Sequence, residues 1–301
     1  MTPLQRYIAE EIAVDHADGI FTRREAIRRL GLLGIGVAAA SSLLAACSSD
    51  SGTTAASTTA AATRTDGPPP GMTGAVASEP VTFAGPEGRT LQGAWAAAAE
   101  PRGSVLVIHE NKGLTDHIRS VAGRFAGAGY SAIAVDLLSE EGGTAKFTDP
   151  AEATAALAKI PADRFVADMK ATVDELERRV PGKKAAAIGF CFGGGLVWQL
   201  LASGEPRLAA ASPFYGPLPE NADFGGSKAA VLAVYAALDT RVSASRDAAT
   251  AALVKAGLDH QVVTEPGADH AFFNDTGPRY NPTAANDVWK KVLDWFGRYV
   301  G

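Results

Sequence analysis

Cysteine is nearly absent from this chain of 301 residues, which contains only Cys47 and Cys191. So small a number excludes a framework of several disulfides. Basic residues are also in slight deficit, with 28 against 33 acidic residues and a net charge of −5. Since nucleic-acid binding usually needs a basic face, we expect no nucleic-acid partner. Hydrophobic residues make up 47% of the chain, enough for one large core and one or two domains.

The N-terminal residues 1–46 have the features of an export signal. The stretch TRREAIR at 22–28 resembles a twin-arginine signal, and residues 30–46 are uncharged but short and glycine-rich for a spanning helix. This stretch runs into Leu44-Ala45-Ala46-Cys47, which resembles a lipobox. We therefore expect cleavage before Cys47, lipidation of its thiol and an exported protein of the cell envelope, anchored to a membrane through this lipid. The alternative is an uncleaved membrane anchor.

A linker is predicted at 47–75, where Ser, Thr, Ala, Pro and Gly dominate. Such a composition buries too little apolar surface to offset the entropy of ordering, so we expect disorder. The catalytic domain is then expected at 76–301. With Cys47 lipidated, Cys191 would be the lone thiol of an exported protein, which calls for a functional explanation.

From residue 76 onward, short apolar runs alternate with amphipathic stretches. The runs SVLVIH at 104–109 and SAIAVDL at 131–137 are typical of parallel strands buried on both faces. Apolar residues at helical spacing predict helices over 117–128, 164–180 and 286–299. Further strands are predicted at 81–83 and 91–97, as an opening antiparallel pair, and at 185–190, 208–215, 229–238 and 261–265, with helices at 192–203 and 245–256. This alternation predicts an α/β fold with a mostly parallel sheet flanked by helices.

The pentapeptide Gly189-Phe190-Cys191-Phe192-Gly193 lies between a predicted strand and a predicted helix. It matches the G-x-S-x-G nucleophile elbow of α/β-hydrolases, with Cys in place of Ser. The nucleophile stands at a sharp strand-to-helix turn, and the helix N-terminus lowers a thiol pKa. The alternative is a small buried cysteine before a glycine-rich turn, because short glycine motifs are weak evidence alone.

Chain order supports the elbow, since the acid and then the histidine follow the nucleophile in this fold. Asp239 ends the strand VLAVYAAL, although a residue there could instead cap the next helix. His270 follows the last predicted strand and is the expected base. Asp269 competes with Asp239 as its partner, but an adjacent residue rarely orients its neighbour's ring. His109 precedes the nucleophile, which is the wrong order, and His117 is expected to cap a helix or face solvent.

These residues predict nucleophilic catalysis in which the Cys191 thiolate attacks an acyl carbon. His270 would take or share the thiol proton, and Asp239 would fix the imidazole tautomer. The oxyanion requires two backbone N–H groups, for which we expect Phe192 and, from the loop after the first parallel strand, Asn111.

With Glu110 added to this triad, the chain resembles the dienelactone hydrolase (carboxymethylenebutenolidase) family over roughly residues 80–300. The stretches that carry the resemblance are VIHENKGLTDHIR, AVDLLSEEGGT, IGFCFGGG and DHAFFNDTGPRYN. The resemblance implies a sheet of about eight strands, a Cys-His-Asp triad without metal or organic cofactor, and a lactone or small ester as substrate. It also implies that Glu110 contacts the resting thiol and changes its role when substrate binds. The alternative for Glu110 is an ion pair with Lys112 or Arg119 at the rim.

The chain departs from the family at two positions. Where characterised dienelactone hydrolases have two arginines that clamp a substrate carboxylate, this sequence has Glu140 and Asn274. Neither replaces a bidentate guanidinium, so an anionic dienelactone is not the expected substrate. Three aromatic residues near the motifs are expected to form an apolar substrate-binding wall, or simply core: Phe190, Phe272 and Phe273.

Two non-hydrolytic functions compete with this interpretation. Lipid-anchored binding proteins also carry lipoboxes, but they usually have two similar α/β lobes rather than one nucleophile-elbow topology. A redox role for Cys191 would need a resolving cysteine, and a lipidated Cys47 cannot serve as one.

Overall fold

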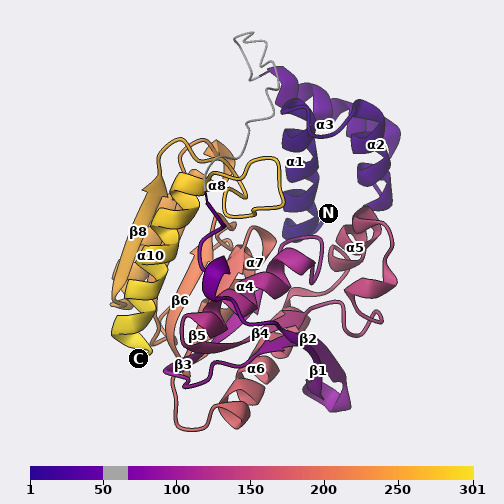
Figure 1. Ribbon diagram of the computed structural model, residues 1–301. Helices are drawn as coiled ribbons and strands as arrows, with labels where there is room; N and C mark the ends of the chain where they lie inside the picture. Colours follow the sequence, from indigo (N-terminus) through magenta and orange to yellow (C-terminus); the bar gives the residue numbers. More distant parts are fainter. Residues whose placement is uncertain (50–66) are drawn as a thin grey trace. The chain divides into compact units, whose positions relative to one another are not determined.

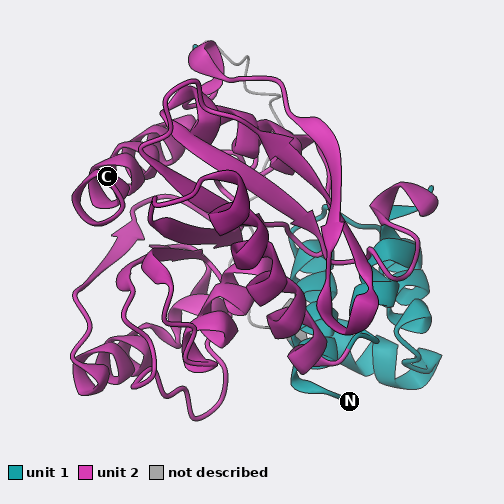
Figure 2. Ribbon diagram, turned by 90° about the horizontal axis from the view of Figure 1, so that it is seen from below, with its two compact units in different colours: residues 1–67, 147–160 teal, residues 68–146, 161–301 magenta. Residues whose placement is uncertain are grey.

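The computed structural model describes residues 1–49 and 67–301 of the chain. It contains two compact units, coloured separately in Figure 2. Unit 1 comprises Met1–Gly67 and Phe147–Ile160, and unit 2 comprises Pro68–Lys146 and Pro161–Gly301. Every residue predicted to carry out chemistry belongs to unit 2.

Unit 2 is built on an eight-stranded sheet with the order β1-β2-β4-β3-β5-β6-β7-β8. The strands are β1 (Glu79–Ala84), β2 (Thr90–Ala96), β3 (Gly103–Ile108), β4 (Tyr130–Asp136), β5 (Ala185–Phe190), β6 (Leu208–Phe214), β7 (Ala230–Ala236) and β8 (His260–Glu265). The first two strands pair antiparallel, β2 runs antiparallel to β4, and all remaining pairs are parallel. All residues of β3, β4, β5 and β7 are buried, as their apolar runs predicted. The predicted α/β-hydrolase fold is confirmed.

Helices cover both faces of this sheet. They are α4 (Asp116–Gly127), α6 (Ala162–Arg179), α7 (Phe192–Ala202), α8 (Thr240–Ser243), α9 (Arg246–Ala256) and α10 (Pro282–Tyr299). Phe125 of α4 stacks on Phe296 of α10 with ring centroids 5.8 Å apart, so these two helices share one face. Helices α6 and α7 contact each other. Because the crossovers through α4 and α7 run in opposite directions along the sheet, right-handed connections place them on opposite faces.

The end of the predicted linker belongs to unit 2, which begins at Pro68 rather than at residue 76. Residues 50–66 lie outside the described part. Met72–Gly74 form a 3₁₀ turn, and the Val76 N–H donates to the Gly123 carbonyl of α4 at 3.0 Å. A Cβ atom on Gly127 would lie only 1.9 Å from the carbonyl oxygen of Gly74, so a side chain there would prevent this close packing.

The described residues of unit 1 form the helices α1 (Pro3–Ala17), α2 (Arg23–Leu32), α3 (Val37–Ser49) and α5 (Pro150–Leu157). Arg28 of α2 forms ion pairs with Glu25 and with Asp149, the N-cap of α5, both at 2.7 Å. The sequence did not predict α5, since its alanine-rich stretch has little amphipathic pattern. The predicted apolar run 30–46 is divided between α2 and α3, and among the described residues no helix is long and apolar enough to span a membrane. Cys47 lies in α3, but its side chain is outside the described part.

Candidate active site

Cys191 occupies a tight turn between β5 and α7, as the pentapeptide predicted. Its backbone has φ 57° and ψ −120°, an unfavourable conformation for a residue other than glycine. The N–H of Cys191 donates to the Phe214 carbonyl at 3.0 Å, which ties the turn to the end of β6. A Cβ on Gly189 would lie 2.2 Å from the Gly193 carbonyl oxygen, and one on Gly193 would lie 2.5 Å from the Ile108 carbonyl oxygen. The two glycines are therefore required by backbone approach.

Asp239 and His270 meet although they follow different strands. The Nδ1 atom of His270 lies 2.6 Å from Oδ2 of Asp239, and both side chains are buried. Burial alone would raise the pKa of Asp239, but the hydrogen bond and charge of His270 lower it below its usual value. Asp239 also accepts from the Val242 N–H at 3.1 Å and so caps α8. The two sequence interpretations of Asp239, partner of a histidine and helix cap, are both correct.

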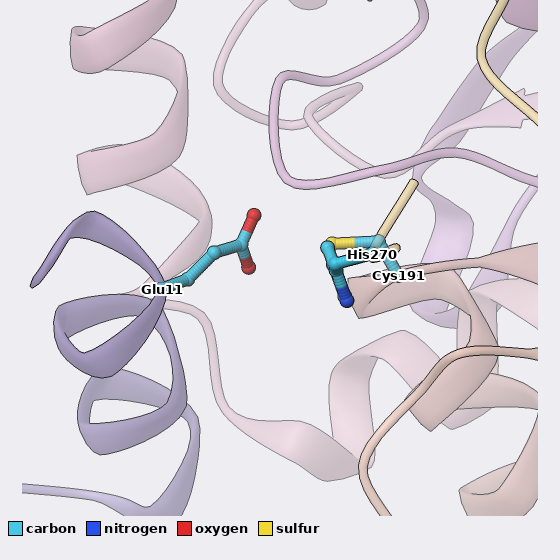
Figure 3. Close-up of side chains that lie close together, drawn as sticks. All are labelled: Glu11, Cys191 and His270. Atoms are coloured by element: carbon cyan, nitrogen blue, oxygen red, sulfur yellow. The ribbon is translucent and has the colours of Figure 1, made fainter. Parts of the chain in front are cut away.

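Asp269 does not orient the imidazole ring. Its carboxylate instead accepts from the backbone N–H of His270 at 2.6 Å and pairs with Arg279 at 3.4 Å. Figure 3 shows the sulfur of Cys191 beside His270. The Cys191 Sγ lies within 4.8 Å of a ring nitrogen of His270. Cys191, His270 and Asp239 thus form a connected series in unit 2.

His109 has a structural role between two loops. Its Nε2 accepts from the Leu137 N–H at 3.2 Å, so Nδ1 carries the hydrogen and donates to the Glu110 carbonyl at 2.6 Å. Complete burial lowers its pKa, which keeps the ring neutral. Both ring nitrogens are engaged, so His109 is not a rival base. Its bonds hold the loop after β3, which carries Asn111, against the loop after β4.

The two predicted oxyanion donors lie at the ends of adjacent elements. Phe192 is the first residue of α7, where a backbone N–H has no acceptor within the helix. Asn111 is buried in the loop after β3. The close approach of Gly193 to the carbonyl oxygens of Ile108 and His109 brings the start of α7 against the beginning of that loop.

Glu110 is held by Asn274. The Nδ2 of Asn274 donates to Oε2 of Glu110 at 2.6 Å, and its Oδ1 accepts from the N–H of Thr276 at 3.0 Å. Within the described ranges, the other carboxylate oxygen, Oε1, is buried without a hydrogen-bond partner. Glu110 is therefore positioned by Asn274, and its predicted contact with the resting thiol stays a prediction.

Comparisons with known proteins now identify the chain. Residues 91–300 match the model of the dienelactone hydrolase family. The chain belongs to this family. A Salmonella typhi protein with the provisional name carboxymethylenebutenolidase is 33% identical over 210 residues, which is 65% of this chain and 77% of that protein. A similarly named protein of Saccharolobus solfataricus is 30% identical over 247 residues, 70% of this chain and 95% of that one.

Solved structures agree with this assignment. A dienelactone hydrolase-like promiscuous phosphotriesterase from metagenomic libraries matches with a TM-score of 0.64 and 27% identity, over 75% of this chain and 100% of that chain. The present protein is thus a hydrolase of the dienelactone hydrolase family.

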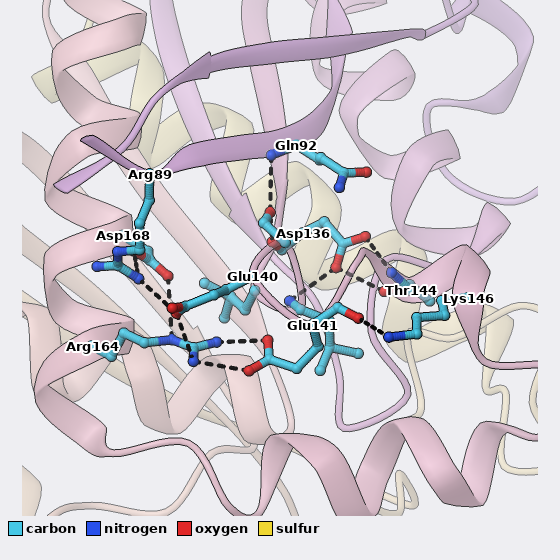
Figure 4. A network of polar contacts seen from close by, with 12 residues as sticks. Arg89, Gln92, Asp136, Glu140, Glu141, Thr144, Lys146, Arg164 and Asp168 are labelled. Atoms are coloured by element: carbon cyan, nitrogen blue, oxygen red, sulfur yellow. Dashed lines mark hydrogen bonds and ion pairs between the residues drawn. The ribbon is translucent and has the colours of Figure 1, made fainter. Parts of the chain in front are cut away.

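In this hydrolase, Glu140 is bound within a network of arginines and acids shown in Figure 4. It forms ion pairs with Arg164 at 2.9 Å and with Arg89 at 3.3 Å. Arg164 also pairs with Glu141 at 2.7 Å, and Arg89 pairs with Asp168 at 3.1 Å. Burial raises the pKa of Asp168 to about 6, although both arginines oppose that shift. The negative charge of Glu140 is therefore balanced inside the protein by Arg89 and Arg164.

The loop that carries Glu140 is fixed from inside. Asp136, the last residue of β4, accepts from the Leu138 N–H at 3.0 Å, the Thr144 N–H at 2.7 Å and the Thr144 hydroxyl at 2.8 Å. One carboxylate thus closes the loop on itself (Figure 4).

The aromatic residues expected near substrate are packed within the hydrophobic core. Phe190 stacks on Phe273 with centroids 5.2 Å apart and planes at 15°, and Phe273 packs further against Phe214 and Trp289. All three predicted wall residues, Phe190, Phe272 and Phe273, are at most 1% exposed. These contacts favour the second interpretation, that they are core.

Sequence reasoning missed Tyr215, which directly follows β6. Its φ of 36° is positive, and its ring lies edge-on to His270 with centroids 5.3 Å apart. Its hydroxyl is buried without a hydrogen-bond partner in the described structure. The available signal was its place at the carboxyl end of a parallel strand, where ligand chemistry gathers. The sequence prediction included it only as the last residue of the strand at 208–215.

The expectation for His117 was wrong, because it neither caps α4 nor faces solvent. Its buried Nδ1 lies 2.6 Å from the carboxylate of Asp275, which also accepts from Arg124 at 3.0 Å. Burial alone would raise the pKa of Asp275, but its bonds to His117 and Arg124 lower it to about 2. Asp275 adjoins Asn274, so this ion-pair cluster anchors the segment that holds Glu110.

Proposed function

We propose that this chain is an exported hydrolase that uses Cys191 to cleave a lactone or small carboxylic ester through a thioacyl intermediate. The single observation that carries the proposal is the geometry of three side chains. A cysteine in the strained conformation of a nucleophile elbow lies beside a histidine whose Nδ1 is bonded to a buried aspartate.

The first half of the reaction forms the thioester. His270 takes the thiol proton through Nε2, because Nδ1 is engaged with Asp239, and the thiolate of Cys191 attacks the acyl carbon. The carbon–oxygen bond of the ester then breaks, and the alcohol oxygen leaves with the proton that His270 held. In a lactone the alcohol remains part of the same molecule.

The second half releases the acid. Water loses a proton to His270 and adds to the thioester carbonyl, and the carbon–sulfur bond breaks. The proton returns to the sulfur, and a carboxylic acid is released. In each half the oxyanion would accept from the N–H groups of Asn111 and Phe192, where the N-terminus of α7 adds positive potential.

The charges around the site favour neutral substrates. Glu140 is negative and already paired with Arg89 and Arg164, and Asn274 is neutral and bonded to Glu110. A substrate carboxylate would find neither clamp arginine at these positions.

A quenched reaction tests the nucleophile directly. The protein is mixed with a p-nitrophenyl ester, acidified during turnover, digested and analysed by mass spectrometry. We expect the acyl group on the peptide that contains Cys191, in wild type and in a Cys47→Ser control. An acyl group found only on another residue would contradict the assignment.

Export rests on the sequence of the N-terminal segment. Support comes from the run TRREAIR and from Leu44-Ala45-Ala46-Cys47, which together predict a twin-arginine signal and a lipid anchor. The expected location is the cell envelope.

A further inference from the structure

Two buried polar atoms near Cys191 have no hydrogen-bond partner among residues 1–49 and 67–301. They are the hydroxyl of Tyr215 and Oε1 of Glu110. The large majority of buried polar side-chain atoms in proteins are hydrogen-bonded, and an orphaned group loses its hydration without compensation. Two such atoms beside one candidate nucleophile point to a ligand that satisfies both.

The two groups are close enough for the charge of Glu110 to act on the Tyr215 hydroxyl. Tyr215 lies edge-on to His270, and the charges of Glu110 and Cys191 both act on its hydroxyl. Burial first, and then these two charges, raise the pKa of Tyr215 well above its usual value, although the backbone of Phe273 opposes this shift in part. The phenol therefore keeps its proton and can donate. Glu110 is fixed through its other oxygen by Asn274.

The chemistry of the pair selects its ligand. An ionised carboxylate only accepts hydrogen bonds, whereas a phenol can donate one. A hydroxyl group satisfies both, because it donates to Glu110 and accepts from Tyr215. An ammonium group could donate but could not accept, and burying its charge costs far more than burying a hydroxyl.

The proposed mechanism leaves one position of the substrate for this hydroxyl. The carbonyl oxygen is assigned to the N–H groups of Asn111 and Phe192, and the leaving oxygen to His270. The remaining neighbour of the reacting carbon is the substituent on the adjacent carbon of the acyl group.

We propose that Glu110 Oε1 and the Tyr215 hydroxyl form a subsite for a hydroxyl group on the carbon next to the scissile carbonyl. The preferred substrates are accordingly 2-hydroxy esters and α-hydroxy lactones. This inference rests on the proposed function.

Four lactones of one ring size test the subsite: γ-butyrolactone and its α-hydroxy, α-fluoro and α-amino derivatives. Fluorine is close in size to a hydroxyl and more electron-withdrawing, but it cannot donate a hydrogen bond. We expect wild-type kcat/KM to be at least about 10-fold higher for the α-hydroxy than for the α-fluoro lactone. In Tyr215→Phe this ratio should fall to about 3 or less, because the loss is specific to the substrate that carries the hydroxyl.

Tyr235→Phe is the matched control. This buried tyrosine of β7 also has a raised pKa, about 12, caused first by burial, but neither Glu110 nor Cys191 contributes to it. The control should keep the wild-type preference for the α-hydroxy lactone.

Equal or better wild-type turnover of the α-fluoro or α-amino lactone would overturn the subsite and leave the proposed hydrolase function standing. Loss of turnover of the hydroxy and unsubstituted lactones to the same extent in Tyr215→Phe would also overturn it. If Tyr215→Phe does not fold, the wild-type ratio of kcat/KM for the α-hydroxy lactone to that for the α-fluoro lactone decides whether the subsite exists. Turnover of all four lactones no faster than by Cys191→Ala would instead defeat the proposed function.

Discussion

Asp239 and His270 are joined by a 2.6 Å contact between Oδ2 and Nδ1, although 31 positions separate them in sequence. In Asp239→Asn the amide would favour the wrong imidazole tautomer, and we expect kcat/KM to fall by up to about 10⁴-fold. Steady-state esterase kinetics measure this effect, with circular dichroism to establish that the variant folds. Asp269→Asn is the control, since that carboxylate contacts the backbone of His270 and not its ring. Equal losses in the two variants would contradict the assignment.

Cys191 and His270 should act as one catalytic unit, so the effects of substituting them should not be additive. Each single substitution by alanine should lower kcat/KM by several decades, and the double variant should be no more than about 3-fold worse than the worse single one. Cys191→Ser should fold, but its kcat/KM should be well below that of wild type, because serine needs a stronger base. A folded Cys191→Ala variant that keeps more than about a tenth of wild-type kcat/KM would rule out Cys191 as the nucleophile.

Neutral substrates should be preferred over anionic ones. Each missing charge-assisted contact to a carboxylate is worth about 1.5–3 kcal/mol, or one to two decades in kcat/KM. The measurement compares a carboxylate-bearing dienelactone with its methyl ester, and the ester should be the better substrate. In Asn274→Arg the ratio of kcat/KM for the methyl ester to kcat/KM for the carboxylate-bearing dienelactone should be smaller than in wild type. A wild-type preference for the carboxylate form would refute the argument.

Asp168 should make stability depend on pH between about 4 and 6. Its pKa is about 6 in the folded protein against an ordinary value of 3.8, because burial disfavours the charge. Its contribution to stability is therefore complete below about pH 4 and is lost as the pH rises to 6. At pH 7, Asp168→Asn should raise Tm by about 2–4 °C, the change that about 1 kcal/mol produces in a domain of this size.

Thermal unfolding measured from pH 4 to 7 checks this expectation, and the pH slope should be flatter in Asp168→Asn. Asp163→Asn, the same change on the exposed side of α6, serves as the control. A variant that unfolds at lower temperature than wild type at pH 7 would show that the ion pairs of Asp168 outweigh its burial.

Processing at Cys47 is testable by mass spectrometry of membrane-extracted protein. We expect a mature form that begins at a lipid-modified Cys47, because TRREAIR and the sequence before Cys47 occur together. Cys47→Ser should abolish the modification. Recovery of the wild-type protein with residues 1–46 attached and Cys47 unmodified would exclude cleavage and lipidation at Cys47.

Local pattern was sufficient to predict the sheet and the elbow. The buried runs of β3 and β4 are continuous in sequence, and Gly189, Cys191 and Gly193 are required by one turn. The histidine and acid followed from their places after buried strands. These features depend on neighbours within a few residues, so they can be predicted from the local sequence.

Contacts between distant loops could not be predicted in this way. Asn274 and Glu110 are 164 positions apart, and His117 and Asp275 are 158 apart. Nothing local distinguishes a buried partner from a solvated side chain at these positions. The role of Tyr215 was hidden for a related reason, because an aromatic residue at the end of a strand usually belongs to the core.

Main-chain contacts fix the shape of the elbow. The N–H of Cys191 bonds to a carbonyl, and the approaches at Gly189 and Gly193 are to carbonyl oxygens. None of these turn contacts is made by the side chain at position 191. In evolutionary terms, the scaffold and its reactive atom are separable, and one base change in a codon could exchange sulfur for oxygen without rebuilding the fold.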